Sequence, residues 1–338
     1  MLMKKLKLIV LYLLLAAALA ATVVSAVAWY WVGQPVTLDS DRIDYLVEPG
    51  SRPRTIAQTM NKAGIHVNED AFVILARLTG QDKQLQAGAY EAVQGDSPRV
   101  LLERMASGDM TQTRLTLVEG WSYKRIRKAL QDNPEVGQTL EGVSDEELLQ
   151  RLGITSTSPE GMFYPDTYVF APGTSDFHIL RRAYHAQQEM LETLWNERDP
   201  NLPLKTPYDA LILASIVEKE TGHSADRGRV AGVFVNRLRL GMPLQTDPTV
   251  IYGMGDAYQG RIRRKDLTTD TPWNTYTRSG LPPTPIASPG RASLLATLHP
   301  ETHKFLYFVS RGDGTSEFST NLASHNRAVA KYILKRGS

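Results

Sequence analysis

The sequence has no cysteine among its 338 residues. This absence excludes disulfide bonds and any metal site that needs a cysteine ligand, and it is compatible with an exported enzyme stabilised by its core. A large excess of basic charge is missing as well, since 38 Lys and Arg residues stand against 36 Asp and Glu. A nucleic-acid-binding protein needs a basic face, so this balance argues against that class.

The motifs of several familiar enzyme classes are also missing. The sequence contains no phosphate-binding P-loop, no dinucleotide fingerprint and no nucleophile elbow around a serine. His299 and His303 have a spacing that suggests two metal ligands one helical turn apart. However, Pro300 fits only the first turn of a helix, and a zinc site needs three or four ligands. We therefore interpret both histidines as structural or surface residues, and we predict neither a metal nor a cofactor.

The N-terminus carries an uncharged run, Leu8 to Val32, which follows three lysines in residues 1–7. As a helix this run would reach roughly 37 Å, enough to cross the hydrocarbon core of a bilayer. The lysines predict a cytoplasmic tail at 1–7 and an exported remainder, and the aromatic residues Trp29–Trp31 suit a membrane interface. A signal peptide cleaved near Val24–Ala26 is the alternative, but the length of the run favours a permanent anchor at 8–32.

Residues 40–110 predict a small α/β module. Ile43–Val47 has the pattern of a strand, and Arg54–Ala63 and Pro98–Ser107 have the pattern of helices. Asp70 could cap a further helix. Residues 111–158 follow as a connecting region, in which a strand-like run meets a glycine turn and then a helix.

Residues 159–338 predict a larger domain, so the fold class of the whole chain is α+β. Its first clear elements are an amphipathic helix over His178–Glu197 and a second helix over Arg227–Leu240. Met242–Pro289 then reads as a long non-helical region rich in Asn, Thr, Tyr and Pro. Ordered irregular segments of this length are usually functional in a compact domain.

One acidic residue stands on an apolar helix. In the segment Tyr208–Gly222, three- and four-residue steps place Leu211, Ala214 and Glu218 on one face. A surface carboxylate would lie on the opposite face, so we expect Glu218 to be half-buried. An ion pair with an arginine or a loop contact would explain this equally simply.

The electrostatics of that position favour acid catalysis. Gly222 predicts the end of the helix, so Glu218 lies in the last turn, where burial and the negative end of the helix dipole both disfavour an ionised carboxyl. A carboxyl that keeps its proton can serve as a general acid. Glu220 is two positions further round the helix, toward the surface with Lys219, and we assign Glu220 a supporting role.

The region around this helix is rich in neutral hydrogen-bonding and aromatic residues, which is the combination that sugars need. A loop scaffold, in which such side chains satisfy their own backbone, is the alternative explanation. The candidate substrate-binding residues are Tyr164, Asn236, Gln245, Thr246, Asp247, Tyr252, Asn274 and Tyr276, with Arg278 beside them.

Five motifs follow one another in this part of the chain: Leu213–Thr221, Val233–Leu238, Leu244–Tyr252, Asn274–Tyr276 and Gly280–Gly290. Together they closely resemble the endolytic murein transglycosylase (MltG, YceG-like) family. Glu160–Tyr168 and Ser324–Asn326 match further segments of that family, and the resemblance covers essentially the whole chain. One departure is visible, because Ser316 or Glu317 stands where relatives often carry a histidine.

The resemblance implies a LysM-like module at 40–110 and a catalytic transglycosylase domain at 159–338, with Glu218 as the catalytic residue. It implies cleavage of peptidoglycan strands between N-acetylmuramic acid and N-acetylglucosamine, which leaves 1,6-anhydro ends and limits nascent strand length. It also implies an inner-membrane enzyme whose catalytic part is periplasmic and whose partners could include peptidoglycan synthases. A muramidase that uses water and a non-catalytic peptidoglycan-binding scaffold are the alternatives.

Overall fold

The computed structural model describes residues 15, 19, 22, 30–221 and 224–334. The predicted anchor at 8–32 lies largely outside these residues. Within the described part of the chain, no helix has the length and apolar character needed to cross a bilayer. Contacts divide the chain into two compact units, one formed by residues 1–113 with 169–173 and the other by the rest. The mixture of helices and short strands confirms the α+β class.

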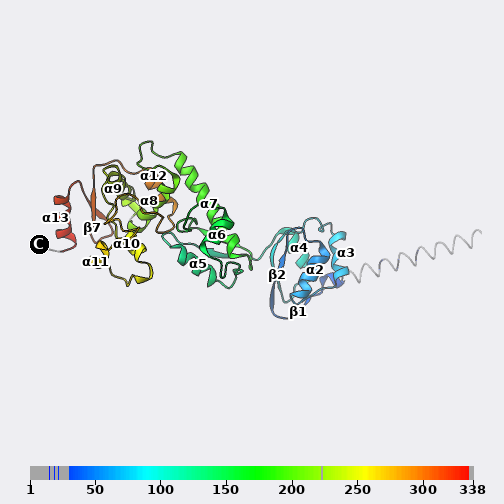
Figure 1. The fold of residues 1–338 in the computed structure, drawn as a ribbon. Helices are drawn as coiled ribbons and strands as arrows, with labels where there is room; N and C mark the ends of the chain where they lie inside the picture. Colours follow the sequence, from blue (N-terminus) through cyan, green and yellow to red (C-terminus); the bar gives the residue numbers. More distant parts are fainter. Residues whose placement is uncertain (1–14, 16–18, 20–21, 23–29, 222–223, 335–338) are drawn as a thin grey trace, which may run out of the picture. The chain divides into compact units, whose positions relative to one another are not determined.

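Among the described residues from 37 to 113, the first unit joins two antiparallel strand pairs to the helices labelled α2, α3 and α4 (Figure 1). In the longer pair, buried and exposed residues alternate along β2, and Tyr45 of β2 lies opposite Tyr90 of β4. The inward side chains form one apolar core with the helices. The elements of this unit are β1 (Thr37–Leu38), β2 (Arg42–Val47), α2 (Pro53–Lys62), β3 (Ile65–His66), α3 (Glu69–Leu78), β4 (Gly88–Val93) and α4 (Pro98–Ser107).

The predicted helices of this unit are present, but one predicted cap is wrong. α2 buries Ile56, Ala57 and Met60, as the pattern indicated, and α4 has the predicted bounds. α3, however, begins at Glu69, and the Asn68 side chain accepts the Ala71 N–H. An asparagine one residue before the helix can reach that donor, whereas the predicted cap already lies in the first turn.

The second unit is mainly helical. Its elements are β5 (Thr113–Thr116), α5 (Tyr123–Gln131), α6 (Asp145–Leu152), β6 (Thr167–Phe170), α7 (Asp176–Asn196), α8 (Pro207–Glu220), η1 (Ser224–Asp226), α9 (Arg227–Arg239), α10 (Asp247–Met254), η2 (Gly255–Ala257), α11 (Arg264–Thr268), α12 (Arg291–Leu298), β7 (Tyr307–Ser310), β8 (Ser316–Ser319) and α13 (Leu322–Tyr332). The strands form two pairs, β5 with β6 and β7 with β8.

Helix α8 is the central element of this unit and packs against α7, α9 and α12 (Figure 1). Every residue from Ala210 to Val217 is buried, so this helix is covered on all sides and not on one face alone. Thr206 and Asp209 form a capping box at its start, and Pro207 occupies the first turn. The sequence of α8 thus fixes where the helix begins and lets its last turn emerge from the core.

The expectation of a long non-helical stretch at Met242–Pro289 is wrong. α10 and α11 lie within it, and Pro248 occupies the first turn of α10, where a missing N–H costs nothing. Both helices are short and are surrounded by turn residues, so the sequence pattern did not predict them.

The predicted domain limits 40–110, 111–158 and 159–338 remain predictions. The observed division of contacts gives one boundary near residue 113.

A buried ion pair in the first unit gives a stability prediction. Arg104 donates to both oxygens of Asp96, at 2.7 and 3.2 Å, and the side chain of Asp96 is 8% exposed. Because Asp96 also accepts the Val93 N–H, Asp96→Ala leaves that donor without its partner, and it leaves Arg104 with the more distant, exposed carboxyl of Asp109, at 3.7 Å. We expect a loss of roughly 3 kcal/mol in the free energy of unfolding, measured by urea denaturation.

The matched control is Glu103→Ala, which removes the partner of Arg99 in a pair whose side chains are about half exposed. It should cost less than about 1 kcal/mol. Equal losses in the two variants would contradict the importance of the buried pair.

Candidate active site

Glu218 lies in the last turn of α8 and is half-buried, which confirms the burial expected from the sequence. Its neighbour Lys219 is exposed. The helix ends at Glu220, with Thr221 as the capping residue, and the predicted terminator Gly222 lies outside the described residues. The carboxyl of Glu218 therefore stands where a buried helix reaches the surface.

Two loops meet at this carboxyl. The Gly120 N–H donates to the Ser288 carbonyl at 2.8 Å, and the Ser288 N–H donates to the Trp121 carbonyl at 2.8 Å. These two bonds lock the loop after β5 to the loop before α12. The next N–H of the second loop, that of Gly290, donates to Glu218 Oε2 at 3.0 Å. No hydrogen bond to Glu218 Oε1 is formed by the described residues, so this oxygen is the one open to a substrate.

A second carboxyl, that of Glu119, adjoins the first. A Cβ atom added at Gly290 would collide with the Glu119 carboxyl, so both acids contact the same glycine. Burial and the nearby charge of Glu218 raise the pKa of Glu119, and the charge of Arg227 opposes this rise. Glu119 was not among the site residues predicted from the sequence. Its one signal is its place between a short strand and Gly120, which has a positive φ of 74°.

A pocket of about 830 Å³ lies next to the chain segments that carry the two acids, although neither carboxyl is part of its wall. Its wall includes Gly120 and Lys219, the chain neighbours of the two carboxyls. Five aromatic side chains also line the wall: Trp121, Tyr123, Tyr252, Tyr258 and Trp273. A largely apolar cleft with a few placed polar groups is typical of a small-molecule or sugar site.

Glu160 is a buried acid of this pocket, only 4% exposed. Its Oε1 accepts the Tyr123 N–H at 2.9 Å, and the Tyr252 hydroxyl also hydrogen-bonds its carboxyl. Burial raises the pKa of Glu160 to about 7, although these bonds and the charge of Lys219 act in the opposite direction. The carboxyl is therefore poised to change its charge near neutral pH.

A separate polar cluster surrounds Glu220. The Thr246 hydroxyl donates to Glu220, and the Tyr276 hydroxyl donates to Asp247 at 2.6 Å. Burial raises the pKa of Glu220, the Thr246 bond lowers it, and the charge of Asp247 raises it again. The expectation that Glu220 points to the surface like Lys219 is therefore wrong, because a loop covers the end of the helix.

Gln245 begins that covering loop with a positive φ of 51°, which is uncommon for a residue other than glycine. Its N–H donates to the Thr275 carbonyl at 3.1 Å, and its side-chain oxygen accepts from the buried Arg237 at 3.3 Å. Three backbone or side-chain acceptors around Arg237, including the carbonyls of Pro243 and Leu244, hold the same loop. The strained backbone is thus fixed by its surroundings.

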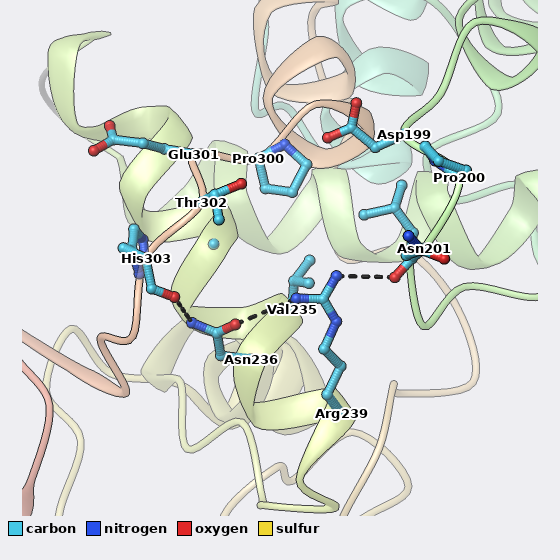
Figure 2. Close-up of a pocket in the computed structure, with 12 residues that line it drawn as sticks. Asp199, Pro200, Asn201, Val235, Asn236, Arg239, Pro300, Glu301, Thr302 and His303 are labelled. Carbon is cyan, nitrogen blue, oxygen red and sulfur yellow. Dashed lines mark hydrogen bonds between the residues drawn. The ribbon is translucent and has the colours of Figure 1, made fainter.

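Two predicted binding residues use their amides within the protein. Asn274 is fully buried and donates to three backbone carbonyls, the nearest that of Thr269 at 2.7 Å. Asn236 donates to the carbonyls of His303 and Phe305. Asn236 lines a different, smaller pocket of about 220 Å³, where Arg239 also donates to the Asn201 carbonyl (Figure 2).

The remaining predicted residues divide between the sites. Tyr252 lines the large pocket, and Tyr164 is close enough to Glu119 for that charge to raise its pKa, after the larger effect of burial. The structure therefore brings Glu218, Tyr252 and Tyr164 to one region, and places Gln245, Thr246, Asp247 and Tyr276 around Glu220. The binding roles of all these residues remain predictions.

Four further side chains singled out in the sequence have protein partners. His299 contacts Asp199 at 3.0 Å, and His303 contacts the Arg229 carbonyl at 2.9 Å. Within the described part of the chain, no three His, Asp or Glu side chains are grouped as metal ligands. Arg278 pairs with Asp270, and Glu317 pairs with Arg311.

Comparison with known proteins gives a consistent set of relatives. The model of the YceG-like family matches residues 45–331. An endolytic murein transglycosylase of Bacillus subtilis is 33% identical over 319 residues, which are 89% of this chain and 88% of that protein. A Streptococcus pneumoniae protein of the same name is 27% identical over 321 residues, 85% of this chain and 58% of the relative. A crystal structure of a yceG-like protein from Listeria monocytogenes is 26% identical, with a TM-score of 0.51 over 85% of this chain and 98% of that one.

The buried carboxyl of Glu160 gives a pH prediction. An unfolded glutamate loses its proton near pH 4.5, whereas Glu160 keeps its proton in the folded state to about pH 7. Between these values the folded state binds more protons, so stability falls as pH rises through this window and is constant above it. Glu160→Gln cannot titrate, and should gain roughly 3 kcal/mol relative to the wild type between pH 4.5 and pH 8.

Urea unfolding of both proteins across this pH range measures the difference. A Glu141→Gln variant, which alters an exposed carboxyl, is the control and should follow the wild type. Parallel curves for the wild type and Glu160→Gln would show that Glu160 titrates normally.

Proposed function

Because the chain belongs to the YceG-like family, we propose that it is a lytic transglycosylase that cuts peptidoglycan strands at internal bonds. The observation that carries this proposal is the position of Glu218. One of its oxygens is held by the Gly290 N–H, the other is open, and its chain neighbour Lys219 lines a pocket of about 830 Å³ with aromatic walls. A held carboxyl beside a sugar-sized cleft is the arrangement that acid catalysis of glycoside cleavage requires.

The reaction needs one proton and no water. Protonated Glu218 donates its proton to the oxygen between N-acetylmuramic acid and N-acetylglucosamine, and the bond from C1 to that oxygen breaks. The C6 hydroxyl of the same muramic acid attacks C1 and closes a 1,6-anhydro ring, and its proton passes to the Glu218 carboxylate. The nucleophile belongs to the substrate, so proximity lowers the barrier. Glu218 ends the cycle protonated, ready for the next strand.

The strand would run along the large pocket. Trp121, Tyr258 and Trp273 offer apolar rings to the faces of the sugars, and Tyr252 offers a hydroxyl close to Glu160. The Glu220 cluster would support the end of α8 from the opposite side, through Thr246. In this proposal Asn236 and Asn274 hold the loops that shape the domain, because their amides already bind backbone carbonyls.

The location and partners belong to the same proposal. The run at 8–32 would anchor the protein in the inner membrane, with residues 1–7 in the cytoplasm and the catalytic domain outside it. The module at 40–110 would be LysM-like and would contact glycan. The enzyme would trim nascent strands during cell-wall assembly, with peptidoglycan synthases as possible partners implied by the family.

A muramidase that uses water is the second candidate, and one observation favours it. Glu119 is a second carboxyl at the same site, and a hydrolase uses a second carboxylate to activate water. Asp247, predicted from the sequence to bind substrate, accepts the Tyr276 hydroxyl near Glu220. A non-catalytic scaffold would need none of these acids.

The role of Glu218 is tested by Glu218→Gln. The amide keeps the shape and can still accept the Gly290 N–H, but it cannot transfer a proton. Turnover of purified glycan strands should fall at least about a hundredfold, with binding retained. Glu220→Gln is the control and should cost much less, since an amide oxygen can still accept from Thr246. Near-normal turnover in Glu218→Gln would eliminate this mechanism.

The products distinguish the candidate functions. We expect digests of long, uncrosslinked strands to give mid-length fragments at early times, each ending in 1,6-anhydro-N-acetylmuramic acid. Mass analysis separates these ends from reducing ends, which are heavier by one water. Reducing ends throughout would establish the muramidase, steady release of disaccharides would show cutting from one terminus, and no turnover would support the scaffold.

A further inference from the structure

Glu119 is an acid next to Glu218 for which the proposed mechanism has no use. It is carried by the loop after β5, and its carboxyl lies against the Cα atom of Gly290. The same glycine donates its N–H to Glu218 Oε2. Glu218 also reaches back to this loop, since its Cγ lies within van der Waals distance, 3.7 Å, of a Cβ placed on Gly120. Both carboxyls are thus held by the same two loops.

Within the described residues, neither Glu119 nor Glu218 has a paired cation to offset its negative charge. Arg227 of α9 is the cation that acts on Glu119, yet within the described part of the chain it forms no ion pair with either acid, and its buried Nε has no partner. Lys219 donates instead to the Gly120 carbonyl at 3.4 Å. Tyr164 is also near this loop: burial and the charges of Asp166 and Glu119 raise the pKa of its hydroxyl, and the charge of Arg291 of α12 lowers it.

Two carboxyls that lie close together without a paired cation repel each other when both are charged, so ionising both costs free energy. The effect is visible in Glu119, since the charge of Glu218 is the second cause, after burial, of its raised pKa. Glu119 therefore keeps its proton to a higher pH than a lone exposed carboxyl would, and a proton on Glu119 removes the repulsion between the two acids.

We propose that Glu119 is a positioning residue whose carboxyl shares a proton with Glu218, so that the site keeps the acid it needs for cleavage at neutral pH. This inference rests on the proposed function. It gives the second carboxyl an electrostatic role in place of the water-activating role it would have in a muramidase. It also explains why glycine occupies position 290, since any side chain there would separate the two acids.

The test is the pH dependence of kcat/KM for glycan cleavage by the full-length protein. Glu119→Gln removes one negative charge, so the basic limb of the profile should move to lower pH by about one unit. Activity at neutral pH then falls about tenfold, whereas activity on the acidic plateau stays within a few-fold of the wild type. Glu119→Asp keeps the charge, so its basic limb should lie at the same pH as that of the wild type.

Gly290→Ala tests the same idea without removing either acid. Its φ of −80° suits alanine, and the new methyl group would push the Glu119 carboxyl away. Gly290→Ala should therefore move the basic limb of the pH profile to lower pH, as Glu119→Gln does. Glu141→Gln, an exposed carboxyl on another loop, is the matched control for loss of a charge. Thermal melting of each variant shows that it is folded.

Two results would overturn the inference. In the first, Glu119→Gln has the basic limb of the wild type, which means that the two acids do not interact. In the second, Glu119→Gln loses activity equally at every pH, as Glu218→Gln should, which means that Glu119 acts directly in the chemistry or the fold. With either result, products with anhydro ends would still support the proposed function. Products with reducing ends would contradict that function, whether or not the basic limb of the pH profile moves.

Discussion

The hydrogen bond from the Gly290 N–H to Glu218 Oε2 joins the end of α8 to the start of α12, and the geometry of the site depends on it. A carboxyl in the last turn of a helix faces carbonyl groups, which repel it, so it needs a donor from elsewhere. The start of a second helix supplies one. The bond fixes one oxygen and leaves the other directed at a substrate.

The packing of α8 makes this arrangement rigid. The helix is buried on all sides, and the Ser215 hydroxyl both donates to the Ile212 carbonyl and accepts the Ile286 N–H at 3.0 Å. Ile286 and Gly290 lie on the same loop, so a side chain inside the helix helps to place the donor that holds Glu218. A site supported by such internal bonds keeps its geometry without the ligand, as efficient catalysis requires.

The sequence predicted the parts of this structure that local patterns determine. Apolar periodicity gave α2 and α4 closely, and the position of Glu218 on α8 gave its partial burial. Short helices such as α10 were not predicted, because turn residues surround them. Asp247 was predicted from its motif to bind substrate, but its hydrogen-bond partner, Tyr276, is brought to it only by the folding of the loops.

Glu119 shows most clearly why sequence alone was insufficient. It lies about a hundred residues before Glu218, and its one local signal is its place before Gly120 in an ordinary strand-and-turn segment. Only the pairing of Gly120 and Trp121 with Ser288 brings it to Gly290 and hence to the catalytic helix. Glu160 is similar, since its raised pKa comes from burial beside Tyr252, which lies far away in the chain. Acid–base properties depend on tertiary contacts that periodicity does not encode.

A crystal structure of the Glu218→Gln variant with a long uncrosslinked glycan strand tests the central claim most directly. The account predicts a strand in the large pocket, passing through rather than ending there. The oxygen between N-acetylmuramic acid and N-acetylglucosamine should lie within hydrogen-bonding distance of the side chain at position 218, on the side of Oε1. A strand bound in the smaller pocket near Asn236, or one whose glycosidic oxygen lies away from position 218, would contradict the account.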